Sequence, residues 1–219
     1  MKSLLFVLTL AVSLSVHAAD VYVEKAAPRK PCPLRGNALP KSKKKANENI
    51  QKNRWNPPTA ADFDNTVTTA ALVKPGNDRT RWNSQRAARI RGYVAVVAPG
   101  TLGESCNCGA KAAVDTDTHI AIVADKSTTQ DKRTYVIVEI TPRLRENLAA
   151  QVPSIDWSTN SLKGRLPGKH VEFEGWLFFD AAHTGEATNT HPKDPKHANW
   201  RATCWEIHPV TALQVLAAP

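Results

Sequence analysis

Short segments in which hydrophobic and polar residues alternate follow one another from residue 89 to the end of the chain. Such alternation is typical of β-strands that are buried on one face. The expected strands cover residues 89–97, 117–123, 134–140, 168–179 and 199–216. Pro142 follows the third strand and suits the first turn of a helix, which we expect over residues 143–150. The order is therefore strand, long loop, strand, strand, helix, strand, long loop, strand.

The last strand carries different chemistry on its two faces. Trp205 and Ile207 lie on a face that resembles a core, whereas Glu206 and His208 lie on the opposite face. Pro209 cannot donate a hydrogen bond to a neighbouring strand, so we expect the pairing to bend or end just after His208. An acid beside a histidine at a strand end is a common way to build a site, and it is also a common feature of a barrel rim.

A helix placed only between the third and fourth of five strands resembles the OB-fold, the small Greek-key barrel that binds oligonucleotides and oligosaccharides. The resemblance covers roughly residues 89–216 and rests on the order of elements, not on a motif. Gly92 and Gly175 lie within strands, where a tightly curved barrel needs bends or bulges. The expected fold class is all-β with one short helix: a five-stranded OB-like Greek-key barrel preceded by an extended basic arm.

The first 18 residues have the pattern of a secretory signal peptide. Lys2 supplies the positive start, residues 4–16 the apolar run, and the end at Ala18 a small-residue cleavage site. The apolar run is too short for a membrane anchor. We therefore expect a protein of the periplasm or the medium, with no transmembrane anchor in the mature chain.

Three further regions follow this segment. Residues 19–58 are rich in proline and lack apolar periodicity, which predicts a flexible arm. Residues 59–88 predict a short helical or irregular segment that packs on the barrel, and residues 89–219 form the barrel domain.

Positive charge is concentrated in the arm. The chain has a net charge of +9, and ten Lys and Arg residues lie between residues 25 and 54. The arm is either a solvated tail or an electrostatic anchor for nucleic acid or another anionic polymer.

The even number of cysteines in an exported chain predicts disulfide bonds. The candidates are Cys32, Cys106, Cys108 and Cys204. A bridge between Cys106 and Cys108 would close a very small ring, which favours pairs of these two with Cys32 and Cys204. The alternative is a metal site with Cys106 and Cys108 as ligands.

In an OB-fold the third and fifth strands run in parallel, so one rim of the barrel gathers acids, histidines and an arginine. The candidate catalytic residues there are Asp117, His119, Glu139, Arg143, Glu206 and His208. The candidate ligand-binding residues are Tyr135, Trp176, Asn199 and Arg201.

Three functions fit this pattern. In a binding module, the aromatic and basic residues would contact a polyanion or glycan. In a hydrolase, His119 or His208 would act as general base, with an acid to orient it and an arginine to hold an anionic transition state. In a structural or partner-binding envelope protein, the same charges would form salt bridges at the rim.

Phosphodiester cleavage would suit the hydrolase, since secreted thermonuclease-like nucleases use an OB-fold. Their pattern of acids and paired arginines is not evident here, so no site residue is carried over. The sequence has no Walker-type phosphate loop, no Gly-x-Ser-x-Gly motif and no His-Glu-x-x-His pair. We expect no cofactor and no metal site among the histidines of residues 180–201, because they lack tight ligand spacing.

Overall fold

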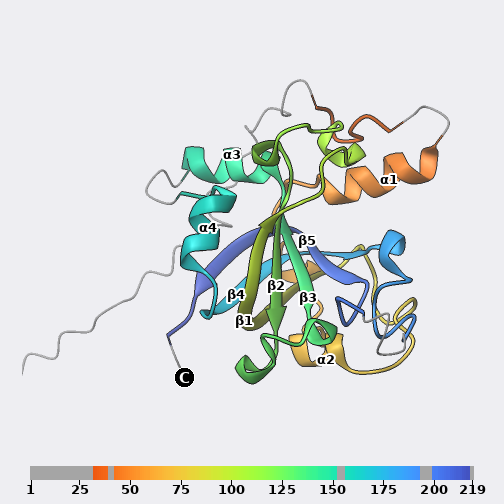
Figure 1. Cartoon of the computed structure of the whole chain (residues 1–219). Coiled ribbons are helices and arrows are strands. Elements are labelled where there is room, and N and C mark those ends of the chain that lie inside the picture. The colour runs from red at the N-terminus through yellow and green to blue at the C-terminus, as the bar shows by residue number, and fades with distance from the viewer. Residues whose placement is uncertain (1–31, 39–41, 152–155, 193–198, 218–219) are drawn as a thin grey trace, which may run out of the picture.

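The computed structural model describes residues 32–38, 42–151, 156–192 and 199–217. These residues form a closed five-stranded barrel, in which the neighbours follow the order β1-β2-β3-β5-β4 (Figure 1). The strands are β1 (Ala87–Pro99), β2 (Thr118–Val123), β3 (Val136–Ile140), β4 (His170–Phe179) and β5 (Trp205–Val215). The expected barrel is confirmed, including the parallel pairing of β3 with β5. The expected signal peptide, residues 1–18, lies outside the described residues.

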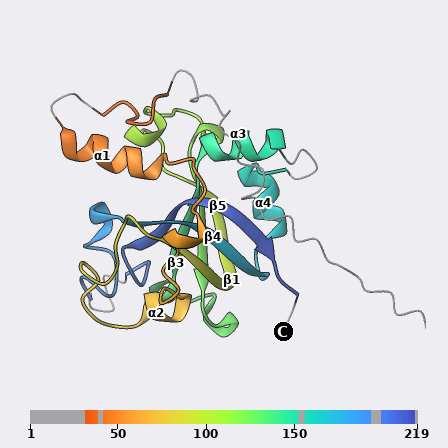
Figure 2. The ribbon, with the colours of Figure 1, turned by 180° about the vertical axis from the view of Figure 1, so that it is seen from behind.

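Four α-helices surround the barrel. They are α1 (Lys43–Lys52), α2 (Thr69–Val73), α3 (Pro142–Gln151) and α4 (Thr159–Arg165). Helix α3 is the one expected between the third and fourth strands. Figures 1 and 2 show α1 and α3 at one end of the barrel and α2 at the other. Among the residues that the structure describes, no helix combines the length and the hydrophobicity that crossing a bilayer requires.

The barrel interior is filled by the inward faces of all five strands. Phe173, Leu177, Trp205 and Ile207 are buried in one cluster with the aliphatic residues of β1, β2 and β3. Trp82, which precedes the barrel, packs edge-on against Trp205 with ring centroids 5.9 Å apart. The expected core face of the last strand is thus the face that lines the barrel.

The strand that contains Pro209 bends and does not end. Strand β5 continues to Val215, and its pairing with β4 shifts register on both sides of Gly175. A Cβ atom added at Gly175 would lie 2.2 Å from the Pro209 carbonyl oxygen, so only glycine fits this close approach.

A second irregularity lies in β1. We expect Val94 and Val96 to face the same way from their spacing, but a register shift between them turns Val96 out to 44% exposure and Val97 into the core. A bulge places one extra residue in the strand and so inverts the alternation beyond it.

The described part of the arm, residues 32–38 and 42–58, is more ordered than its composition predicts. Residues 43–52 form helix α1 and not an extended segment, and the Ser42 side chain accepts a hydrogen bond from the Lys45 amide at its start. Asn49 and Asn53 are buried, and Asn53 donates to the carbonyl oxygens of Leu34 and Cys106. These tertiary hydrogen bonds hold a helix that lacks a strongly apolar face.

Candidate functional site

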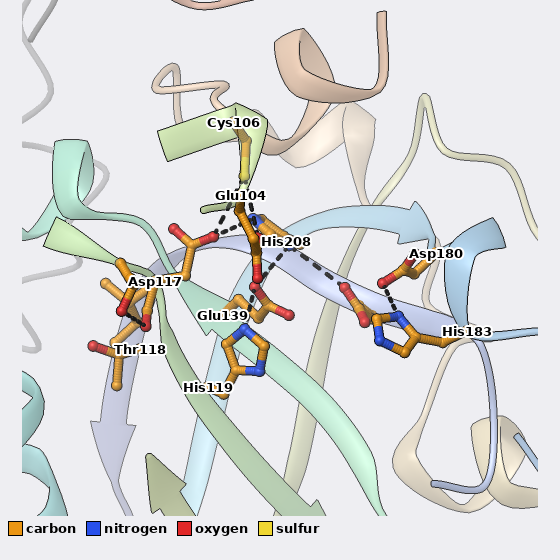
Figure 3. Close-up of polar contacts among 12 residues, drawn as sticks. Glu104, Cys106, Asp117, Thr118, His119, Glu139, Asp180, His183 and His208 are labelled. Carbon is orange, nitrogen blue, oxygen red and sulfur yellow. Dashed lines mark hydrogen bonds and ion pairs between the residues drawn. The ribbon is translucent and has the colours of Figure 1, made fainter. Parts of the chain in front are cut away.

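The outward faces of three adjacent strands bring five ionisable side chains together at one end of the barrel (Figure 3). Asp117 precedes β2, and His119 within β2 pairs with Glu139 of β3. Glu206 and His208 come from β5, which lies beside β3 in parallel. We call these five residues the acid–histidine cluster. Five of the six candidate catalytic residues therefore do lie together.

His208 occupies the centre of the acid–histidine cluster. Its Nδ1 atom lies 3.2 Å from Glu139 Oε2 and 3.4 Å from Glu206 Oε2. Its Nε2 atom lies 3.8 Å from Asp117 Oδ2. On the other side of Glu139, His119 Nε2 lies 3.2 Å from Glu139 Oε2. Two histidines therefore share one carboxylate.

The cluster is almost completely shielded from solvent. Asp117, Glu139, Glu206 and His208 are each at most 2% exposed. His119 is the exception among the five, with a side chain that is 25% exposed. The ring of His119 is therefore the edge of the cluster that meets solvent.

Lys52, which the sequence did not single out, adds a positive charge to the cluster from helix α1. Its side chain is buried, and its ammonium group lies 5.2 Å from the centre of the Phe178 ring. Burial acts to lower the pKa of Lys52, but the negative charges of Glu139 and Glu206 help to raise it well above its ordinary value. A lysine at the end of a basic helix gave no sequence signal, because its burial depends on how α1 docks.

Arg201 extends the cluster. The guanidinium is 1% exposed, and its Nη2 atom lies 2.8 Å from Glu206 Oε1. Its Nη1 atom lies 4.0 Å from Asp180, which in turn contacts His183 at 2.6 Å. Arg201 therefore balances the charge of buried carboxylates. We expected its guanidinium to contact a ligand, but in the structure it is buried against these carboxylates.

The electrostatic environment shifts the pKa values of Asp117 and Glu139 in opposite directions. Burial raises the pKa of Asp117, and the charge of Glu139 adds to this increase. Burial would also raise the pKa of Glu139, but His119 and His208 lower it well below its ordinary value. Burial acts to lower the pKa of His119, but the charge and hydrogen bond of Glu139 outweigh it and raise the pKa to about 9.

Arg143, the sixth candidate catalytic residue, contacts the arm. Its Nη2 atom donates to the carbonyl oxygens of Cys32 at 3.0 Å and Pro33 at 3.3 Å. Its guanidinium also lies 5.3 Å from the centre of the Trp55 ring. The start of α3 thus anchors the arm, an interaction that the order of elements could not reveal.

The candidate ligand-binding residues do not form an open stacking surface. Tyr135 is buried and donates its hydroxyl proton to the Thr129 carbonyl oxygen. Trp176 is half-buried: its indole nitrogen donates to the Asn56 carbonyl oxygen, and Arg54 lies 5.0 Å from its ring. Asn199 is buried and donates to the His191 carbonyl oxygen. The loops and the arm cover the surface that we expected to bind a ligand.

The four cysteines form one disulfide and leave two thiols. Cys32 pairs with Cys108, while Cys106 and Cys204 are free and buried. The expectation that all four would pair is wrong, because Cys204 lies beside Thr190 at the start of β5 and Cys106 faces Asp117. A metal site with Cys106 and Cys108 together is also ruled out, since Cys108 is in the disulfide.

Among the residues that the structure describes, two overlapping sets of side chains could hold a metal ion. One consists of Glu104, Cys106 and Asp117, and the other of Asp117, Glu139 and His208. Within each set the donor atoms lie within 4.8 Å of one another. Asp117 belongs to both sets, which makes it the centre of this donor-rich region.

Comparison with known proteins leaves the role of these residues open. No protein-family model, curated protein or solved structure matches the chain significantly, so any function has to be argued from the cluster itself.

Proposed function

We propose that the chain is a hydrolase that uses the acid–histidine cluster on a phosphodiester or a similar anionic ester. The observation that carries the proposal is the pairing of partly exposed His119 with buried Glu139, backed by His208 and two further carboxylates. A histidine held by a carboxylate at a solvent edge is the arrangement that general acid–base catalysis requires. A surface salt bridge would not need three further buried ionisable groups behind it.

Each residue has a distinct part in this proposal. His119 exchanges a proton with the substrate or with the attacking water, and Glu139 orients its ring. Lys52 and Arg201 supply positive charge that offsets the buried carboxylates in a dry environment. His119 is thus the candidate catalytic residue, while the others are positioning residues.

The barrel supports the same proposal. We assign it to the OB-fold superfamily because β3 and β5 are parallel and α3 lies between β3 and β4 in the chain. In that fold the face of the second and third strands, with its flanking loops, contacts the ligand. His119 and Glu139 lie on that face. The signal-like start of the sequence, together with the Cys32–Cys108 disulfide, supports export to the periplasm or medium.

A second candidate function is the binding of a polyanion such as nucleic acid without turnover. Lys43 and Lys44 are exposed in the first turn of α1, which contains no acidic residue. The positive end of a helix dipole disfavours cations there, and a bound polyanion would offset this cost. This observation favours a contact with phosphate groups along α1.

One experiment tests both functions. Labelled single- and double-stranded oligonucleotides are titrated with mature protein at low and moderate salt, with and without divalent metal, and then run on a denaturing gel. The variant His119→Gln keeps a hydrogen-bonding side chain but cannot transfer a proton. Its control is His170→Gln, because His170 stacks on Tyr93 and belongs to no part of the cluster.

If the chain is a hydrolase, wild type and His170→Gln should cleave the oligonucleotides. His119→Gln should cleave them on the order of 100-fold more slowly, or more slowly still. Binding without cleavage would support the second function. In that case the double variant Lys43→Gln/Lys44→Gln should bind with a shallower slope of log affinity against log salt concentration, by the amount expected for about two lost phosphate contacts. Neither binding nor cleavage would leave a structural or partner-binding role.

A further inference from the structure

One ring nitrogen of His208 is left without a hydrogen bond. Its Nδ1 atom faces the carboxylates of Glu139 and Glu206, so the Nδ1 proton is held on that side. Its Nε2 atom is buried without a hydrogen-bond partner among the described residues, and so is Asp117 Oδ1. Unpaired polar atoms in a dry interior are costly unless something binds them.

The Cys106 thiol and the Glu104 carboxylate lie next to the unpaired atoms of Asp117 and His208. Cys106 Sγ lies 3.9 Å from Asp117 Oδ2 and 3.4 Å from Glu104 Oε2. The same Asp117 oxygen lies 3.8 Å from His208 Nε2. Figure 3 shows Cys106 and Glu104 approaching from the loop above the strands, while Asp117 and His208 approach from the barrel.

The loop that carries Cys106 is held in place from two sides. The disulfide from Cys32 closes on Cys108, two residues beyond it. Asn53 donates to the Cys106 carbonyl oxygen at 2.9 Å, and Asn49 donates to the Ser105 hydroxyl at 3.0 Å. The thiol is therefore positioned against Asp117 before anything binds.

We propose that Cys106, Asp117 and His208, with Glu104, bind one zinc ion. Sulfur, nitrogen and oxygen donors in a set of four are the ligands that zinc takes in tetrahedral sites, whereas magnesium and calcium prefer oxygen alone. Ideal zinc bonds place neighbouring donors about 3.4–3.6 Å apart. Three donor separations here, 3.4, 3.8 and 3.9 Å, are close to these values. The two donor sets meet at Asp117, so His208 has to move toward Cys106 and Glu104 when the ion binds.

The surroundings of His208 also match those of a zinc ligand. Metal-binding histidines usually donate their second ring N–H to a carboxylate, which is itself held by a further partner. Glu206 accepts from His208, and Arg201 holds Glu206 at 2.8 Å. Glu139 lies on the Nδ1 side of the ring, so it belongs to this surrounding shell.

Charge favours a cation at this place. Cys106 loses its proton to solvent on binding, as a thiolate ligand must. Glu104, Asp117, Glu139, Glu206 and the Cys106 thiolate then outnumber the cations Lys52, Arg201 and protonated His119. The proposal holds whether or not the acid–histidine cluster hydrolyses a substrate, since it concerns only what these four residues bind.

The test uses the mature chain, expressed so that the disulfide forms and stripped of metal with a chelator. Zinc content after reloading is measured by mass spectrometry, and Co²⁺ is titrated while the absorption spectrum is recorded. The variants are Cys106→Ser and His208→Gln. Their control is Cys204→Ser, which removes the other free, buried thiol.

We expect one equivalent of metal in wild type and in Cys204→Ser, with a sulfur-to-cobalt charge-transfer band. The band should vanish in Cys106→Ser, and His208→Gln should weaken zinc binding by more than about tenfold. The absence of stoichiometric binding to folded wild type, or a band that persists in Cys106→Ser, would overturn the proposal.

Alkylation of the wild-type thiols keeps the test decisive if Cys106→Ser does not fold. The reaction is run at a urea concentration at which the metal-free protein labels Cys106. Zinc should then slow the labelling of Cys106 more than that of Cys204, and equal labelling of Cys106 with and without zinc would refute the site. Zinc binding without oligonucleotide cleavage would refute only the hydrolase. Cleavage by a protein that binds no metal would refute only the zinc site.

Discussion

Lys52 of helix α1 lies over the ring of Phe178 in β4, with its ammonium group 5.2 Å from the ring centre. This contact joins the arm to the barrel at the edge of the acid–histidine cluster. It also explains why Phe178, which faces outward from the barrel, is only 2% exposed. The arm is thus part of the site, although the sequence alone predicts a tail.

Replacement of Lys52 by methionine should destabilise the protein. The substitution keeps the apolar stem over Phe178 but removes the positive charge that faces Glu139 and Glu206. Loss of one partner of a buried charge pair costs about 3 kcal/mol or more. Urea unfolding measures the change, and Lys44→Met in the exposed first turn is the control, with an expected effect below about 0.5 kcal/mol. Equal effects of the two substitutions would show that Lys52 is not buried against the cluster.

The non-reduced protein should contain two free thiols and one disulfide. Alkylation of the unfolded, non-reduced chain should label Cys106 and Cys204, and proteolysis should release a linked pair of peptides from Cys32 and Cys108. Because this bond closes a loop of 76 residues, Cys32→Ser should cost about 4 kcal/mol of unfolding free energy in the chain-entropy model. A chain with no free thiols would contradict the pairing.

Alanine should not fit at position 175. Its Cβ atom would lie 2.2 Å from the Pro209 carbonyl oxygen and 2.7 Å from the Ile207 side chain, so the β4–β5 ladder would have to move. We expect Gly175→Ala to lower the midpoint of thermal unfolding and to reduce the free energy of unfolding by at least about 2 kcal/mol. Gly185→Ala is the matched control, because nothing lies within 4 Å of its Cβ position. A Gly175→Ala protein as stable as this control would argue against the bulge.

His183 should make stability depend on pH. Its hydrogen bond with Asp180 raises the pKa of His183. Burial acts to raise the pKa of Asp180, but the same hydrogen bond together with the positive charges of Lys52, His183 and Arg201 lowers that pKa. A histidine with a raised pKa stabilises the fold fully below about pH 6.5, the unfolded value, and the contribution disappears as pH rises through the raised folded value.

The His183 side chain is 35% exposed, so solvent screening keeps this contribution below about 1 kcal/mol. Unfolding free energies of wild type and His183→Gln should therefore differ most near pH 6 and converge at high pH. The control is His170→Gln, whose ring stacks on Tyr93. A difference that grows with pH would contradict the assigned pair.

The strands and the face of each residue on them followed from local alternation. The order of elements then indicated a barrel in which β3 and β5 run in parallel, and this topology alone brought His119, Glu139 and His208 together. Alternation failed at the β1 bulge, because one extra residue inverts every position beyond it.

What the sequence determined by itself was the barrel, since its signals lie between residues that are neighbours along the chain. Only the tertiary structure decided that Arg143 anchors the arm, that Arg201 is buried against Glu206, and that Lys52 closes the cluster. It also decided which cysteine pairs with Cys32. These contacts join residues far apart in sequence, and their energy comes from packing and desolvation that no local pattern records.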